Sequence, residues 1–466
     1  MKKNLSKLLL ISLLALGSTA CGNKESTILE DPEVTIPDLE GEMEQLSPDQ
    51  SKEFLSKTAD EFLSKFNPKD QEELIELCSY FEKRYGDLDI PENWYLDWEE
   101  TDDSGNPRAL LSGLKNAFMG ASPSRAASAI YTYVLDLDWE KFKGIYKPSG
   151  YDWEYIGESD DIIFQFNDSQ GRPCEVKAVA SSKTSDGKIK WADVYEEYYY
   201  DYVTDEYYEY IERDENTVRF KIPKEITLTV KNNSTTLVSS KITSDIDVNG
   251  HKININTNIS AANVNIDVNL DGTDTRVTQN STFTVSGETL LQTMATVNGS
   301  KLCDFDNYSQ LYEDFDAEED LVKLLKNGTA YVDIMGKVRI DGSGTYTQAL
   351  YEAFNNDFDN WEYSSTAEAE RAVQNAINTI KNNIKGIVRY NNTQTVQASL
   401  TWKSYFREYG WGDYWSYNIE PLIYFEDGTT YAFEKYIQDG FESVEGAWRD
   451  LQKSYEKVWN SISLRR

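Results

Sequence analysis

Apolar and polar side chains alternate with a period of two through the middle of the chain. Between residues 222 and 302, for example, Val264, Ile266 and Val268 alternate with Asn265 and Asp267. This alternation predicts β-strands with one aliphatic face and one polar face. We therefore expect a long-stranded antiparallel meander whose aliphatic face contains seven residues in particular: Ile246, Val248, Ile253, Ile255, Val264, Ile266 and Val268.

Short turn motifs mark where these strands reverse. Asn249-Gly250 predicts a two-residue type I′ turn, because both residues tolerate a positive φ. Further hairpins are expected over residues 162–179 and over 421–433, where turn residues separate two alternating runs. The Asn249-Gly250 turn would align three cross-strand pairs: Val248 with His251, Asp247 with Lys252, and Ile246 with Ile253.

A period of 3.6 residues replaces the alternation near the N-terminus. Three segments begin with a capping residue followed by proline, as helix N-termini often do: Ser47-Pro48, Asn67-Pro68 and Ser122-Pro123. Apolar stripes follow these starts over residues 54–66, 74–85 and 130–134. The pattern predicts a mostly helical region over 47–140.

Helical stripes return after residue 304, at 317–326, at 369–384 with Gly386 as the C-cap, and at 441–463. Because strands and helices occur in separate blocks, the fold class is expected to be α+β. We expect a long-stranded antiparallel, curved, half-barrel-like β-sheet packed against helices, with a helical N-terminal region and a C-terminal helix. Residues 141–304 would form the antiparallel β meander, and residues 305–466 an α+β region that completes the sheet.

The first residues have the pattern of a bacterial lipoprotein export signal. Three lysines precede the apolar run Leu8 to Leu16, and the small residues Ser18-Thr19-Ala20 precede Cys21. The apolar run is too short to span a bilayer. Residues 1–20 are therefore expected to be a signal peptide, residues 21–46 an acidic tether, and Cys21 the lipidated residue that binds the membrane. The alternative is an ordinary signal peptide with a chance cysteine.

Charge and composition exclude several functions. The formal net charge of −34 opposes binding to nucleic acid and to bare anionic lipid surfaces. His251 is the only histidine, so zinc sites built on two or three histidines are excluded, and any imidazole base must be His251. The cysteines include no CxxC motif; Cys78 lies in an apolar stripe, and pairing of Cys174 with Cys303 stays open.

No recognisable catalytic or metal-binding constellation accompanies these residues. Asp245-x-Asp247-x-Asn249-Gly250 matches the first half of an EF-hand loop, but Asn256 stands where the bidentate glutamate belongs. A hairpin turn explains this segment better. The chain is expected to be non-enzymatic, with no cofactor and no metal.

Two aromatic runs are candidate binding surfaces. The tyrosine- and glutamate-rich run 195–210 could contact sugars or a protein partner, or could form an edge hairpin whose acids keep it soluble. The aromatic run 405–415 includes two glycines, and its Arg407 and Asp413 could bind the hydroxyl groups of a sugar. The alternative is that its aromatic side chains pack in the core. The possible ligand-binding residues of this second run are Tyr409, Trp411, Tyr414 and Trp415.

Four segments together resemble uncharacterised lipoproteins of Bacteroidetes: the lipobox ending at Cys21, the hairpin Ile162 to Cys174, the entry Ile222 to Ile226, and Pro421 to Tyr431. The resemblance implies a lipid-anchored location in the cell envelope, at the outer membrane, facing the periplasm or the cell surface. It implies no active site. The expected function is that of a non-enzymatic envelope lipoprotein that binds a hydrophobic ligand or lipid on its curved sheet. The alternative is a surface glycan- or protein-binding module that uses exposed Tyr and Trp.

Overall fold

The computed structural model describes residues 46–89, 91, 94, 99–100, 127–201, 206–304, 324–391, 393, 395–409, 414–432, 449–451 and 453–454. Cys21, Trp411 and Asp413 lie outside the described residues, as do the signal peptide and nearly all of the tether.

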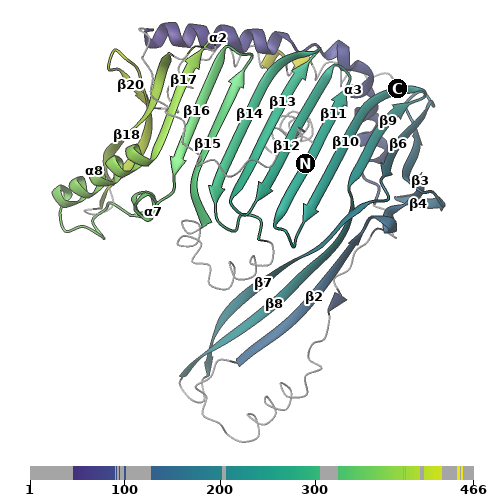
Figure 1. Ribbon diagram of the computed structural model, residues 1–466, viewed down its shortest axis with the longest axis horizontal. Helices are drawn as coiled ribbons and strands as arrows, with labels where there is room; N and C mark the ends of the chain where they lie inside the picture. The colour runs from purple at the N-terminus through teal and green to yellow at the C-terminus, as the bar shows by residue number, and fades with distance from the viewer. Residues whose placement is uncertain are drawn as a thin grey trace, which may run out of the picture.

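The main sheet has 16 strands, almost all antiparallel, and its two end strands, β20 and β4, do not pair with each other (Figure 1). Only β3 and β5 pair in parallel. The sheet is therefore open. In spatial order its strands are β20 (Thr430–Ala432), β19 (Trp415–Tyr424), β18 (Val396–Glu408), β17 (Ile384–Tyr390), β16 (Val338–Thr345), β15 (Leu325–Ile334), β14 (Glu288–Gly299), β13 (Arg276–Val285), β12 (Val264–Thr273), β11 (Lys252–Ala261), β10 (Thr235–Asp247), β9 (Glu225–Asn232), β6 (Pro173–Ala180), β5 (Ile162–Asn167), β3 (Gly144–Ser149) and β4 (Asp152–Gly157).

A second sheet projects from the main one as a long, narrow arm (Figure 1). Its strands, in spatial order, are β1 (Glu99–Glu100), β2 (Ala127–Asp138), β8 (Glu206–Pro223) and β7 (Thr184–Asp201). The hairpin β7–β8 is antiparallel over its whole length, and β2 runs parallel to β8.

The described helices and 3-10 turns are few: α2 (Pro48–Ser64), η2 (Pro68–Gln71), α3 (Glu72–Tyr85), η5 (Trp139–Phe142), α7 (Gln348–Asn355) and α8 (Thr366–Asn383). The expected capping box at the start of α2 is confirmed, because the Ser47 hydroxyl accepts the Gln50 N–H and the Gln50 side chain accepts the Ser47 N–H. Residues 449–451 and 453–454, within the expected C-terminal helix, are helical; the rest of that helix lies outside the described residues.

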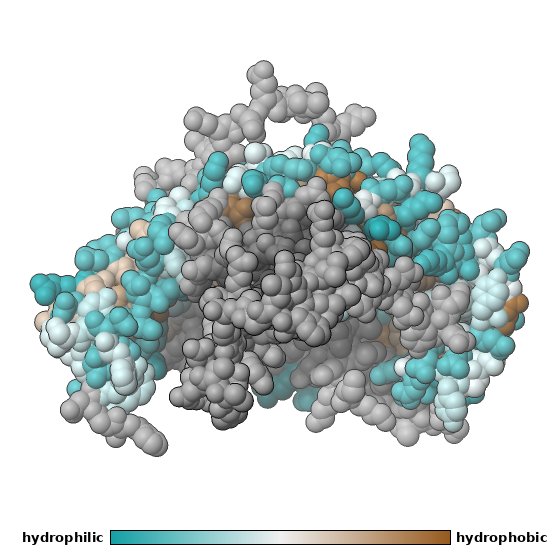
Figure 2. All heavy atoms as spheres, turned by 90° about the horizontal axis from the view of Figure 1, so that it is seen from below, coloured by the Kyte–Doolittle hydropathy of each residue, from teal (hydrophilic) through white to brown (hydrophobic). Residues whose placement is uncertain are grey.

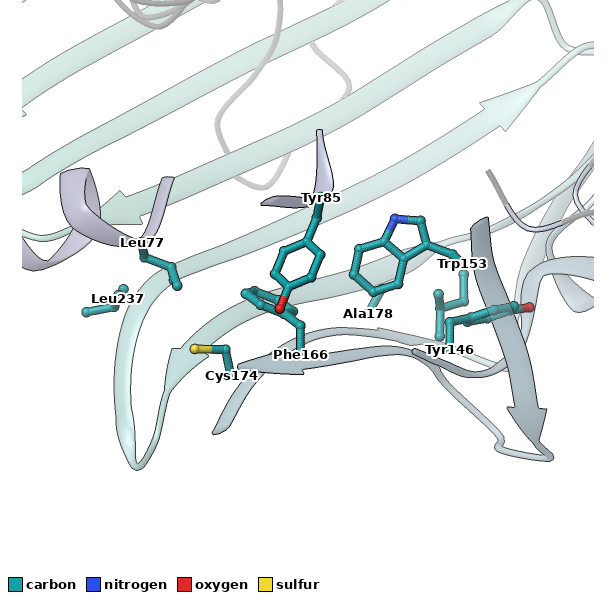
Figure 3. Packing of buried hydrophobic residues seen from close by; sticks show 9 residues of the cluster. Leu77, Tyr85, Tyr146, Trp153, Phe166, Cys174, Ala178 and Leu237 are labelled. Atoms are coloured by element: carbon teal, nitrogen blue, oxygen red, sulfur yellow. The ribbon is translucent and has the colours of Figure 1, made fainter. Parts of the chain in front are cut away.

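The helices pack on one face of the main sheet, which we call the aliphatic face. Phe62 of α2 and Phe66, just after the end of α2, lie against a buried cluster that contains Val264, Ile266 and Val268. At one end of the sheet, α3 places Tyr85 beside Phe166 and Trp153, with ring centroids 5.4 and 5.9 Å away (Figure 3). At the other end, α8 packs on β18 and β19 through Trp402, Tyr417 and Ile419.

The opposite face, the polar face, is linked across strands by side-chain hydrogen bonds. Asn254 donates to Asp271 and Asn258 donates to Asp267, between β11 and β12. Seen from below, the described residues at the surface are mostly hydrophilic (Figure 2). The expected division into an aliphatic and a polar face is confirmed.

Two of the three pairs expected between β10 and β11 are confirmed, but Val248 and His251 lie in the loop instead of pairing, and the turn is not of the expected type. Ile246 pairs with Ile253 and Asp247 with Lys252. The positive φ falls on His251, at 50°, instead of on Asn249 and Gly250. The loop is four residues long, because the Asp247 carboxylate accepts the Gly250 N–H at 2.9 Å and stabilises a wider turn.

The prediction of a mostly helical region over 47–140 is wrong at its C-terminal end. Residues 127–138 form strand β2 instead. The segment is rich in β-branched and aromatic residues, and Leu135 and Leu137 alternate with Asp136 and Asp138. Because the 18-residue strand β8 offers a long partner, pairing in parallel with it is favoured over a helix.

Two further helix expectations need correction. Gly386 is not a C-cap, because α8 ends at Asn383 and Ile384 is already extended, with φ −120° and ψ 124°. Gly386 lies within β17 opposite Gly342, where a Cβ would approach the Leu400 Cβ at 3.2 Å. Leu325 and Lys326, expected at the end of a helix, begin β15 because they pair with their neighbouring strands; residues 317–323 lie outside the described residues.

We predict that Ile266→Ala lowers the free energy of unfolding by about 2–5 kcal/mol, because it leaves a cavity beneath α2. Ile266 is 3% exposed and lies in the cluster that Phe62 and Phe66 contact. Urea unfolding followed by circular dichroism measures the change. Asn265→Ala, one residue along on the polar face, is the control and should cost about 1 kcal/mol or less. Equal losses in the two variants would contradict one-sided burial.

Candidate functional site

Four of the seven residues expected on the aliphatic face belong to the buried core. Val264, Ile266 and Val268 are 2–4% exposed beneath α2. Val248 is buried against the arm, because a Cβ built on Gly187 of β7 would lie 2.4 Å from the Val248 Cγ2 and 2.6 Å from Phe220. These four side chains stabilise the fold and are not free to contact a ligand.

The other three, Ile246, Ile253 and Ile255, are only half-buried. The Ile246 N–H donates to the Ser185 hydroxyl at 3.2 Å, which attaches the arm to β10. Ile253 lies near Cys303, since a Cβ on Gly272 would approach both the Ile253 Cγ2 and the Cys303 Sγ, at 2.7 and 3.0 Å. Ile255 lies further from the strand end and towards the middle of the aliphatic face.

Cys303 lies at the strand-end boundary of this face, where its surroundings disfavour the thiolate. Its side chain is 2% exposed, and burial, together with Asp274 and Asp271, raises the pKa of its thiol to about 11. Cys174 is also free and buried, and its pKa is raised to about 11 mainly by burial. The open question of their pairing is settled, because both are free thiols.

His251 lies between two carboxylates at the same boundary. Its Nδ1 is 2.7 Å from the Asp274 Oδ2, and its Nε2 is 3.9 Å from the Asp304 Oδ1. The imidazole therefore ties the β10–β11 loop to the segments that hold Asp274 and Asp304. With the thiol of Cys303 protonated, this corner is suited to structure more than to nucleophilic chemistry.

The middle of the aliphatic face has a row of small side chains. Ala295, Ala330 and Gly342 are aligned across β14, β15 and β16. Among the described residues, a Cβ on Gly342 would meet only carbonyl oxygens of the neighbouring strands, at 3.9 and 4.0 Å, so no described side chain lies directly above it. Ile340, two residues away on the same face, is 45% exposed.

The same row continues across β13 and β12 to Leu270 and Ile255. None of the helix-packed clusters of the described residues contains these side chains. We call this set the open region: Ile255, Leu270, Ala295, Ala330, Ile340 and Gly342.

A groove of about 670 Å³ lies where the arm meets the β10–β11 loop. Its lining includes the apolar residues Leu137, Phe220 and Val248, and both acidic and basic side chains of β2, β7 and β8. Opposite charges alternate across these strands: Asp138 and Asp186 both neighbour Lys221, and Arg219 reaches Asp136 at 4.0 Å. The groove is therefore close to electrically balanced and does not favour a ligand of one charge.

The tyrosine-rich run forms the outer half of the β7–β8 hairpin. Tyr198 pairs with Glu209 and Tyr199 with Tyr208, and β7 is the last strand of its sheet. The backbone therefore has the edge-hairpin arrangement, one of the two interpretations of this run.

Three of the four aromatic residues expected to bind a ligand come together at the β18–β19 hairpin. The rings of Tyr409 and Tyr414 lie 5.2 Å apart, and the Tyr409 N–H donates to the Tyr414 carbonyl at 3.0 Å. Trp415 contacts Phe406, which is 43% exposed, with ring centroids 6.3 Å apart. Arg407 pairs with Glu420 at 3.4 Å, and its side chain is 58% exposed.

A further aromatic residue beside this hairpin, Trp361, was not among the residues expected from the sequence. Asp359 orders the turn that carries it. The Asp359 carboxylate accepts hydrogen bonds from the backbone N–H of Trp361 at 2.9 Å, from the backbone N–H of Glu362 at 3.2 Å and from the Tyr414 hydroxyl at 2.9 Å. Burial alone would raise the pKa of Asp359, but these three hydrogen bonds outweigh burial and lower it. The only available signal in the sequence was a tryptophan among acidic, Asn and Ser residues.

Comparisons with known proteins give little beyond the geometry. No protein-family model matches the chain, and no match was found among curated proteins. One solved structure, a porin-like protein from Bacteroides vulgatus, is similar at 7% sequence identity and a TM-score of 0.16. The similarity covers 44% of this chain and 79% of that one.

The described residues lack both a membrane-spanning helix and a metal-binding cluster. None of their helices is long and apolar enough to cross a membrane. Nor do they contain a cluster of three or more His, Cys, Asp or Glu side chains placed to bind a metal ion.

We predict that Asp359→Asn lowers the free energy of unfolding at pH 7 by about 1–2 kcal/mol, because it weakens three hydrogen bonds to a charged acceptor. The pKa of Asp359 is lowered in the folded state, so its stabilisation is present above the unfolded pKa of about 4 and is lost as pH falls below it. Urea midpoints at pH 7 and pH 3 should therefore differ less in the variant than in the parent. Asp357→Asn, an exposed neighbour, is the control and should change neither midpoint.

Proposed function

We propose that this protein is a lipid-anchored, non-enzymatic protein of the bacterial envelope that binds the apolar part of a ligand on the open region. One observation carries the proposal: the aliphatic side chains of this region stay partly exposed while those on either side are covered. Ile340 is 45% exposed, whereas Ile266 and Val268, on the same face, are 2–3% exposed.

The surroundings of the open region suit an elongated apolar group. On the same face, α2 covers one end of the strands, Cys303 covers the other end at β11–β13, and α3 and α8 cover the two ends of the sheet. The small side chains of Ala295, Ala330 and Gly342 leave room between these boundaries. The open region is therefore a shallow apolar surface lined by alkyl groups and glycine.

The chemistry of the lining favours an uncharged ligand surface. The six residues of the open region carry no charge, and the row between Leu270 and Ala295 is completed by Gln279, which is polar but neutral. A ligand that removes about 200 Å² of apolar surface from water would gain roughly 5 kcal/mol before the cost of immobilisation. An acyl chain or a comparable hydrocarbon fits this requirement, and a free ion does not.

Membrane anchoring rests on the sequence around Cys21, and the exclusion of nucleic acid as a partner rests on the net charge of −34. The absence of enzymatic activity is supported by the state of the reactive groups. The thiols of Cys174 and Cys303 have raised pKa values, which disfavours the nucleophilic thiolate form.

We predict that Ile340→Gln and Ile255→Gln each weaken binding of the neutral fluorescent probe N-phenyl-1-naphthylamine by roughly threefold or more, because each places an amide in the apolar contact. The measurement is a fluorescence titration of the chain that lacks residues 1–21. Val179→Gln is a matched control, because Val179 is 41% exposed and one residue along from Ala178 of the aliphatic face, so it lies on the polar face. Its probe affinity should be unchanged.

Native mass spectrometry after purification from the host envelope provides a second readout. The proposal expects a stoichiometric hydrocarbon ligand in the parent and less of it in Ile340→Gln. Probe binding that is equal in all three variants, together with a ligand-free parent, would contradict binding at this face.

We predict that Cys21→Ser abolishes incorporation of an alkyne-labelled palmitate analogue and releases the protein from the membrane fraction, because the acyl chains that anchor it are no longer attached. Metabolic labelling followed by fractionation measures both effects. Cys78→Ser is the control and should be labelled like the parent. Continued labelling of the Cys21→Ser variant would show that the lipid is attached elsewhere.

A further inference from the structure

Trp361 is exposed to an unusual degree for a residue in an ordered turn. Its side chain is 82% exposed. The preceding residues extend the main sheet, since Asp359 forms a bridge with Ser416 of β19 and the Tyr417 N–H donates to the Phe358 carbonyl at 2.8 Å. The turn closes through a hydrogen bond from the Tyr363 N–H to the Asp359 carbonyl at 3.0 Å. The backbone that presents the indole is therefore held in place on both sides.

The same carboxylate that orders this turn also holds the neighbouring aromatic pair. Asp359 is 8% exposed and binds both the Trp361 N–H and the Tyr414 hydroxyl, so these residues are held next to each other. Tyr409, which is 40% exposed, lies against Tyr414. Two separate parts of the chain, the 359–363 turn and the β18–β19 hairpin, thus present an exposed indole and two phenol rings on neighbouring backbone. We call this set the Trp361 surface: Trp361, Tyr409 and Tyr414.

The charge around this surface restricts the kind of ligand. Asp357 and Glu362 are exposed, and their side chains make no ion pair or hydrogen bond with other described residues. Carboxylates accept hydrogen bonds from hydroxyl groups but repel phosphate, sulfate and uronate groups. Anionic membranes and anionic polysaccharides are therefore disfavoured.

We propose that the Trp361 surface binds a neutral carbohydrate, whose C–H faces stack on the indole and phenol rings while its hydroxyl groups donate to Asp357 and Glu362. Aromatic rings supply large, rigid contact area at low entropic cost, and the apolar faces of a sugar ring match it. The site lies beside the β18–β19 hairpin and does not overlap the open region, so it is independent of the function proposed above.

Affinity electrophoresis of the full chain tests this proposal. The protein is extracted in tetraethylene glycol monooctyl ether, a detergent without a sugar headgroup, and run in gels that contain laminarin, yeast mannan, dextran or galactomannan. Polygalacturonate is the anionic comparison. The proposal expects retardation by at least one neutral polysaccharide and not by polygalacturonate.

Trp361→Ala should weaken that retardation roughly tenfold or more without lowering the melting temperature, because the side chain makes few contacts in the folded protein. Tyr151→Ala is the matched control: Tyr151 is 84% exposed, follows β3 at the other end of the sheet, and should not matter. The proposal is overturned if no neutral polysaccharide retards the parent, if Trp361→Ala migrates like the parent, or if polygalacturonate binds as strongly as the neutral polymers.

Discussion

Burial of one face of a wide sheet is the constraint on which the rest of this structure depends. Sixteen strands that alternate apolar and polar side chains create a large aliphatic surface, and water must be kept from most of it. The sheet is open, and α2, α3 and α8 cover parts of this surface from three sides. The covered parts form the core, and the part between them becomes the candidate binding surface.

The local pattern was enough to predict the strands and much of their register. The pairing of Ile246 with Ile253 follows from the position of the turn and the alternation alone and is confirmed, although the turn itself has a different type. Strand β2 was not predictable in the same way, because its parallel partner lies about 80 residues away and pairs Ala127 with Tyr210. Non-local pairing of this kind leaves no periodic signal that distinguishes a strand from a short helix.

The candidate sites depended even more on distant contacts. Ala295, Ala330 and Gly342 form a row only once the register of three strands is known, so their sequence shows merely isolated small residues. Of the expected aliphatic residues, the alternation could not tell which would lie beneath α2 and which would stay partly exposed. Trp361 gave no signal by itself, because its position beside Tyr414 is set by the single carboxylate of Asp359.

The proposed function requires an apolar ligand on the open region of the aliphatic face. Photo-crosslinking with a diazirine-bearing fatty acid, followed by peptide mapping, tests it most directly because the label marks whatever the chain touches. We expect labelled peptides from β11, β12, β14, β15 and β16, and loss of that labelling when unlabelled fatty acid competes. Labelling confined to the arm or to the polar face, or labelling that no competitor removes, would contradict it.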